Sequence, residues 1–179
     1  MSEAYRDYDP LMGTGYFDVW LEGTSFDNPA NGSFAATLTR LIYDGSAGTF
    51  NVSQAGGPLS LGATNGLRWN QTVAGLGGTV RMVEARIEDA TTFNNDQATL
   101  SFYVSSAVDG TPLQIEVVQF FGSGGNANGP GGNASADVTV SSDWFVAEQA
   151  TELRTFTFAV PSTAGKYFGA NYDDCLKIC

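Results

Sequence analysis

Alternation of apolar and polar residues is the strongest local signal in this chain. Leu100, Phe102 and Val104 alternate with Ser and Tyr, and the stretches Ile115–Phe121 and Arg154–Val160 repeat the same period of two. In a β-strand this period places the apolar side chains on one face. We therefore predict strands in these stretches, with their apolar faces turned toward a core.

Shorter apolar segments, separated by Gly, Pro and Asn, extend the pattern along the chain. Further predicted strands span 16–21, 34–43, 49–54, 66–73, 79–87, 138–140 and 144–146, with a last short one around Leu176 and Ile178. The only helix that we expect is a turn or two near Met82–Asp89. Many short strands divided by turns are typical of an all-β fold, a jelly-roll β-sandwich.

Composition and charge narrow the possible functions. The chain has 179 residues, a net charge of −11 and no His. Binding to nucleic acid or to an anionic membrane needs clustered Lys and Arg, so we expect neither partner. Without His, Ser-His-Asp nucleophiles and the common zinc sites are excluded. No apolar run approaches the ~18 residues of a membrane span, so we expect no membrane insertion.

Residues 1–15 differ from the remainder, which we predict to be one domain over 16–179. The segment has no hydrophobic period and several charges, followed by Gly-Thr-Gly. It is either a disordered terminus or an arm that anchors the protein to a partner. The apolar contacts of such an anchor would come from Tyr5, Tyr8, Pro10, Leu11 and Met12.

Seven segments occur in the order found in a known family. They span Phe17–Gly32, Tyr43–Ser53, Leu67–Gly75, Glu84–Phe93, Thr99–Tyr103, Val117–Gly125 and Phe156–Lys166. In this order they resemble the jelly-roll domains of bacteriophage virion proteins, which are similar to carbohydrate-binding modules and occur in tail fibres and head appendages. The resemblance implies a non-enzymatic protein of the virion surface, a capsid decoration, head spike or fibre component. Such a protein attaches to the particle and stabilises it, recognises glycans of the host surface, or does both.

The chain departs from that family in two places. The position of a common family Trp falls near Thr151, and family members continue past the equivalent of Leu176 with further strands. A jelly roll without its last strand exposes an unpaired edge. We therefore expect a cover for that edge, from the N-terminal arm, other virion proteins or a second subunit. A homo-oligomer is expected, with a trimer favoured.

Glycan recognition requires an aromatic face for the sugar ring and polar groups for its hydroxyls. The candidate residues are Trp144, Tyr103, Tyr43, Asp143, Asn126 and Asn128. Trp144 follows Ser-Ser-Asp and is expected to be exposed, whereas Trp20 and Trp69 lie in apolar alternation and are expected in the core. A free-standing carbohydrate-binding module is the alternative to a virion protein.

A carboxylate glycosidase is the remaining alternative. Glu84 and Glu88 would share one face of a helix, but ion pairing with Arg81 and Arg86 is the ordinary outcome of this pattern. We expect no cofactor. Acidic loops and Asp173-Asp174 carry oxygen ligands for calcium, but no D-x-D-x-D-G loop is present. Of the two cysteines, Cys175 is expected to pack as a small apolar residue.

Overall fold

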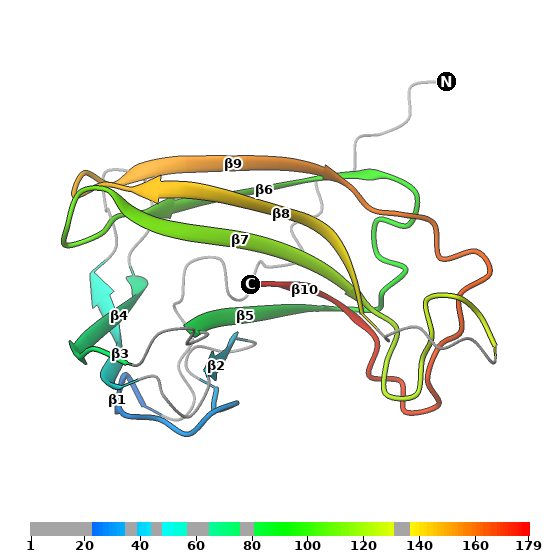
Figure 1. Cartoon of the computed structure of the whole chain (residues 1–179), viewed down its shortest axis with the longest axis horizontal. Helices are drawn as coiled ribbons and strands as arrows, with labels where there is room; N and C mark the ends of the chain where they lie inside the picture. The colour runs from blue at the N-terminus through cyan, green and yellow to red at the C-terminus, as the bar shows by residue number, and fades with distance from the viewer. Residues whose placement is uncertain (1–22, 35–38, 44–47, 57–64, 76–80, 131–136) are drawn as a thin grey trace. The chain divides into compact units, whose positions relative to one another are not determined.

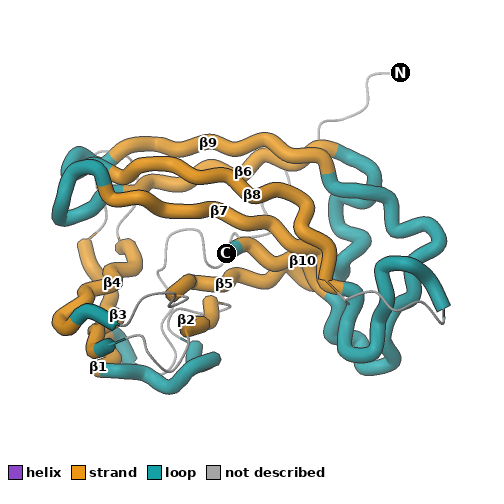
Figure 2. The backbone as a smooth tube through the Cα atoms, viewed as in Figure 1, coloured by secondary structure: helices purple, strands orange, loops and turns teal. Residues whose placement is uncertain are grey.

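The computed structural model describes residues 23–34, 39–43, 48–56, 65–75, 81–130 and 137–179. These ranges contain strands and loops and no helix (Figures 1 and 2). The all-β prediction is therefore confirmed, whereas the jelly-roll order of strands stays a prediction. Contacts divide the chain into two compact units, Met1–Arg81 and Met82–Cys179. The predicted 1–15 arm and the first predicted strand lie outside the described residues.

The described strands of the first unit are β1 (Ser25–Asp27), β2 (Thr39–Tyr43), β3 (Thr49–Gly56) and β4 (Asn65–Val73). Three of them form a small antiparallel sheet in the order β1-β3-β4. Phe50 and Val52 alternate with polar residues on β3 and are buried, and Leu41 of β2 is buried as well. The Trp69 ring stacks on Phe50 and is only half-buried, so Trp69 borders this core.

The second unit is built on a larger antiparallel sheet. Its strands β5 (Arg81–Glu88), β10 (Cys175–Ile178), β7 (Thr111–Phe120) and β8 (Asp137–Ala147) are hydrogen-bonded in that order. A separate pair, β6 (Gln97–Val104) and β9 (Glu152–Ala159), forms a two-stranded sheet. Phe145 of β8 contacts Phe102 of β6 and Phe156 of β9, so the core lies between these two layers.

Residues 82–89 do not form the helical turn that we expected, because Arg81–Glu88 is strand β5. The Arg86 guanidinium and the Glu84 carboxylate are 2.7 Å apart. Residues two apart share a face in a strand but not in a helix. Glu84 and Arg86 lie on one face of the strand, and the buried Ile87 lies on the other. This alternation with a period of two favours a strand over a helix in this segment.

The C-terminal strand is interior, which corrects the expectation of an open edge at that end. Cys175–Ile178 pairs with β5 on one side and with β7 on the other. Leu176 lies opposite Ile87 in one ladder and Gln119 in the other, and none of its surface is exposed. A strand that is hydrogen-bonded on both sides needs no cover. Cys175 is buried, as expected of a small apolar side chain, and its thiol is free.

One further pair of predicted strands differs in detail from the structure. The short strands predicted at 138–140 and 144–146 are one strand, β8, interrupted only by an irregularity opposite Val117 and Val118. The Gly-rich loop after β7 is held in place over residues 122–130. Asp173 accepts hydrogen bonds from the backbone and hydroxyl of Ser123, and a Cβ on Gly125 would lie 2.1 Å from the Phe121 carbonyl oxygen. Close packing therefore requires glycine there.

Candidate polar sheet face

One face of the larger sheet carries an exposed tryptophan next to polar side chains. In the β7–β8 ladder Gln114 lies opposite Trp144, and Glu116 lies opposite Ser142. Directly opposed residues point to the same side of a sheet. We call this surface the polar face, and it consists of Trp144, Gln114, Ser142, Glu116, Thr139, Asp137 and Lys177.

Trp144 is the exposed aromatic side chain at one end of the polar face. Its side chain is 69% exposed, and its neighbours Gln114 and Ser142 are exposed too. The Gln114 amide donates a hydrogen bond to the Ser142 hydroxyl at 2.6 Å. A flat indole beside an amide and a hydroxyl offers an apolar plane and polar groups within one small area, and such a combination gives both contact area and orientation to a ligand.

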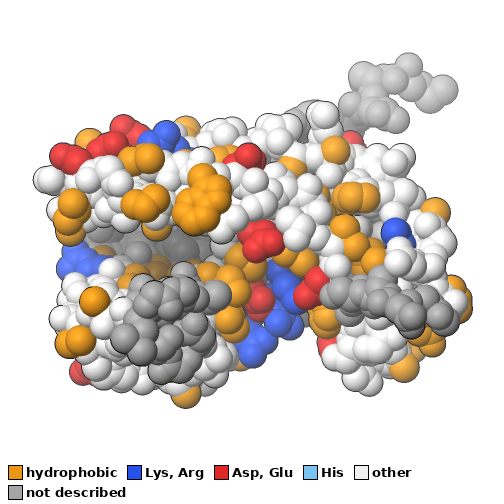
Figure 3. All heavy atoms as spheres, viewed as in Figure 1, with side chains coloured by type: hydrophobic (Ala, Val, Ile, Leu, Met, Phe, Trp, Pro, Cys, Tyr) orange, Lys and Arg blue, Asp and Glu red, His pale blue; other side chains and the backbone are white. Residues whose placement is uncertain are grey.

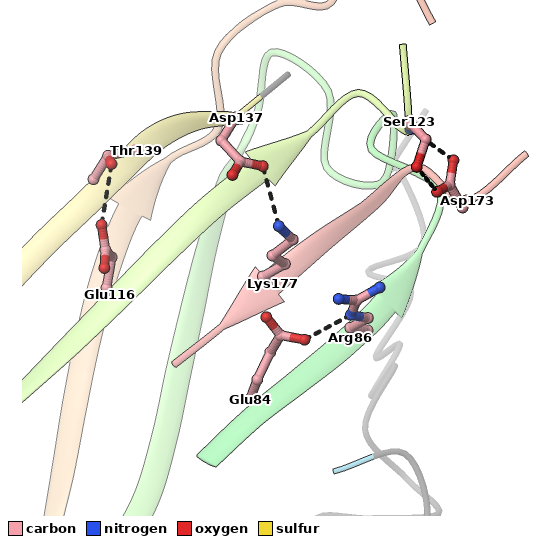
Figure 4. A network of polar contacts seen from close by, with 8 residues as sticks. All are labelled: Glu84, Arg86, Glu116, Ser123, Asp137, Thr139, Asp173 and Lys177. Carbon is pink, nitrogen blue, oxygen red and sulfur yellow. Dashed lines mark hydrogen bonds and ion pairs between the residues drawn. The ribbon is translucent and has the colours of Figure 1, made fainter. Parts of the chain in front are cut away.

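Hydrogen bonds and ion pairs fix the remaining side chains of the polar face (Figure 4). The Thr139 hydroxyl donates to Glu116 at 3.1 Å, and Lys177 Nζ lies 3.1 Å from Asp137. The same ammonium group lies 4.0 Å from the centre of the Phe120 ring, a cation–π contact. These contacts hold the long side chains in place, so the face is ordered before any ligand arrives.

Among the described side chains on this side of the sheet, acidic groups slightly outnumber basic groups. Glu84, Asp137 and Glu116 are acidic, Arg86 and Lys177 are basic, and each of these two cations is paired with a carboxylate. Acidic and basic side chains also lie against one another in the space-filling view (Figure 3). Burial acts to lower the pKa of Arg86, but the hydrogen bond and charge of Glu84 more than offset it, so this pKa is raised. Arg86 is therefore a permanent cation bound to Glu84.

Cys179 directly follows β10 and lies opposite Glu116 of β7. Its backbone exchanges both hydrogen bonds with Glu116, and its thiol is free. Burial, followed by the negative charges of Glu84 and Glu116, raises the pKa of the Cys179 thiol to about 12. The group is thus a neutral thiol at physiological pH and not a nucleophile, because only the thiolate is reactive.

The structure distributes the six predicted glycan residues over separate places. Tyr43 belongs to the first unit, where its hydroxyl donates to the Pro29 carbonyl oxygen and its ring contacts Phe50 edge-on. It therefore has a structural role. Trp144 and Asp143 are neighbours on β8 but point to opposite faces, and Asp143 accepts a hydrogen bond from Ser141. Only Trp144 of this pair belongs to the polar face.

The other three candidates lie on further surfaces of the second unit. Tyr103 is exposed on the outer side of the β6–β9 sheet, opposite Leu153. Asn126 is buried, its backbone pairs with Tyr167, and its side-chain oxygen accepts a hydrogen bond from the Asn128 backbone. Asn126 therefore shapes the loop, and Asn128 is exposed beside it. No single site contains all six residues.

The two glutamates considered for glycoside hydrolysis do not share a helical face as expected. Positions 84 and 88 are four residues apart along strand β5, which corresponds to about 13 Å between backbone positions. Among the described residues, no group of three or more His, Cys, Asp or Glu side chains could hold a metal ion. In the same ranges no helix is long and apolar enough to cross a membrane.

Sequence reasoning missed most of the residues around Trp144. Gln114 and Ser142 are far apart in the chain and meet only through the register of β7 and β8. The sequence did show the alternation along β7, in which the polar Gln114 and Glu116 alternate with the buried Ile115 and Val117. This alternation identifies the polar side of the strand, but it does not identify which strand lies next to it.

Comparisons with known proteins add no identification. No family model, no curated protein and no solved structure matches this chain.

Proposed function

We propose that this protein is a non-enzymatic recognition module of a virion surface that binds glycans through its polar face. The observation that carries the glycan part is the exposed indole of Trp144 on an ordered sheet, next to the Gln114 amide and the Ser142 hydroxyl. The C–H groups of a pyranose ring stack on an indole, while amides, hydroxyls and carboxylates bind sugar hydroxyls.

The charges of this surface favour neutral sugars. Arg86 and Lys177 are each bound to a carboxylate, and Glu116 adds a further negative charge. An acidic sugar would meet a surface with excess negative charge on a chain of net charge −11. Neutral hexoses or their oligomers are therefore the ligand class that the polar face suits best.

A glycan array that contains neutral, sialylated and uronic-acid-containing oligosaccharides tests the proposal. We expect binding to neutral glycans, and a loss of roughly 10-fold or more in affinity for Trp144→Ala, as for the truncation of an aromatic hot spot. Gln114→Ala should weaken binding less. Tyr103→Ala is the matched control, because it removes an exposed aromatic side chain from a different sheet.

Two results would contradict this assignment. Equal binding by wild type and Trp144→Ala would place the glycan site elsewhere, and loss of binding only in Tyr103→Ala would move it to the β6–β9 sheet. A folded wild-type protein that binds no glycan would leave capsid decoration, without glycan recognition, as the better proposal.

Attachment to a virion rests on the resemblance of the sequence to phage jelly-roll domains and on the 1–15 segment. We expect the protein among the components of purified particles. Deletion of residues 1–15 should abolish its incorporation while the β-sheet spectrum persists. Unchanged incorporation of the truncated protein would refute the anchor. Absence from particles, together with retained glycan binding, would favour a free-standing carbohydrate-binding module.

A further inference from the structure

Beyond Trp144, the same side of the sheet continues with two apolar side chains. Pro112 lies opposite Val146 in the β7–β8 ladder, next to the pair of Gln114 and Trp144 on that face. Side chains alternate between the two faces along a strand, so all four point to the same side. Pro112 is exposed and Val146 is 43% exposed. We call Pro112 and Val146 the apolar end.

The surroundings of Trp144 therefore differ in chemistry from one side to the other. The Gln114 amide and the Ser142 hydroxyl lie beside it and are hydrogen-bonded to each other at 2.6 Å. In the other direction, Val146 follows two residues after Trp144, which corresponds to about 6.6 Å along a strand. A pyranose ring with its substituents is wide enough to span this distance. A sugar stacked on the indole thus meets polar groups on one side and the apolar end on the other.

The apolar end offers a ligand no side-chain hydrogen bond. Side chains of Val and Pro carry neither donor nor acceptor, and Pro also lacks a backbone N–H. The backbone oxygen of Val146 accepts a hydrogen bond from Arg154 Nη2 at 2.7 Å. The next carboxylate along the chain, that of Glu148, accepts one from the Gly110 backbone at 3.1 Å. A sugar hydroxyl over Val146 and Pro112 therefore loses water without gaining a side-chain partner.

We infer that the site at Trp144 selects 6-deoxyhexoses, neutral sugars with a methyl group where other hexoses carry a hydroxymethyl group. This inference rests on the proposed glycan-binding function and names the ligand class of the same site. The C–H face of the sugar ring stacks on the indole, and ring hydroxyls are directed to Gln114 and Ser142. The methyl group of the sugar contacts Val146 and Pro112.

Two effects of the apolar end favour the methyl group. Burial of one methyl group raises affinity by roughly 4-fold. A hydroxyl at the same place weakens binding further, because it loses hydrogen bonds to water. The site lies on an open sheet face, so the preference should be roughly 4- to 10-fold and not the roughly 100-fold of an enclosed pocket.

Matched pairs of sugars test the inference with the full chain. The probes are methyl glycosides of L-fucose and L-galactose, of L-rhamnose and L-mannose, and of D-fucose and D-galactose. The members of each pair share one anomeric configuration and differ only in the hydroxyl on carbon 6. Affinities are measured by ligand-observed NMR or calorimetric titration. In each pair that binds, we expect the deoxy sugar to bind roughly 4- to 10-fold more tightly.

Three variants connect this preference to the apolar end. Val146→Thr places a hydroxyl beside the sugar methyl group at nearly constant volume and suits a strand, so it should reduce the preference to roughly 2-fold or less. Val73→Thr is the matched control, because it makes the same change at an exposed valine of the first unit and should leave the preference intact. Trp144→Ala should weaken binding of both members of a pair.

The possible failures are distinguishable. Equal binding of both members of a pair through Trp144, a full preference in Val146→Thr, or the same loss of preference in Val73→Thr would each overturn the inference and leave the proposed glycan site standing. A folded wild type that binds none of these sugars and no glycan on the array would refute the proposed glycan binding together with the inference.

Discussion

Replacement of Leu176 by Ala tests the interior position of strand β10. The side chain is 0% exposed and lies between Ile87 of β5 and Gln119 of β7. The substitution removes three carbon groups, which corresponds to about 2.4 kcal/mol at about 0.8 kcal/mol each. The cavity left behind adds to this value, so we expect a loss of roughly 3–4 kcal/mol in the free energy of unfolding, within the range for buried Leu→Ala changes.

The matched control is Leu153→Ala on β9. Leu153 is 56% exposed, so the same chemical change should cost roughly 1 kcal/mol or less. Urea denaturation followed by tryptophan fluorescence or circular dichroism measures both variants. With a slope of about 1–3 kcal/mol per molar urea, Leu176→Ala should lower the midpoint by at least ~1 M.

The result that refutes the reasoning is a similar small effect for both variants. An edge position for β10 would lead to that outcome, because an edge strand packs against fewer neighbours. If Leu176→Ala does not fold, Leu176→Val against Leu153→Val makes the same comparison with a smaller cavity. The buried position should then still be the more costly of the two.

Three further predictions concern the loop after β9 and the C-terminus. Ser123 lowers the pKa of Asp173 through two hydrogen bonds. The folded state therefore gains stability above the ordinary pKa of 3.8 and loses it as the pH falls below that value. Asp173→Asn should reduce this fall of the melting temperature at acid pH. Tyr172 is 94% exposed with φ of 55°, so Tyr172→Asn should raise stability by roughly 0.5–1 kcal/mol in thermal melts, because Asn tolerates this conformation better. With its pKa raised to about 12, Cys179 should resist alkylation at pH 8 in the native protein and react after unfolding, as read by mass spectrometry.

Each of these has a clear contrary outcome. If the melting temperatures of the wild type and Asp173→Asn fall equally at acid pH, then the Ser123 hydrogen bonds do not stabilise the fold. A lower melting temperature for Tyr172→Asn would show that the Tyr172 ring contributes contacts that outweigh its backbone conformation. Rapid native alkylation of Cys179 would show that the C-terminal end of the sheet opens readily.

The local pattern of apolar and polar residues was sufficient to predict the strands in which these residues alternate strictly. Leu100, Phe102 and Val104 face the core and Tyr103 faces outward, as the period of two predicts. The same local reasoning predicted the exposure of Trp144. It was ambiguous at Glu84 and Arg86, because charges spaced along a short segment are compatible with a helix and with a strand. The tertiary pairing of β5 with β10 resolves that ambiguity.

The sequence by itself determined the all-β class and which side of several strands is apolar, because alternation is a property of neighbouring residues. It could not determine that β10 lies between β5 and β7, since those partners are distant in the chain. It also could not place Gln114 and Ser142 around Trp144. Register between β7 and β8 decides which side chains meet, and a shift of one residue would turn Trp144 to the other face. The grouping of polar side chains beside Trp144 therefore depends on the tertiary structure.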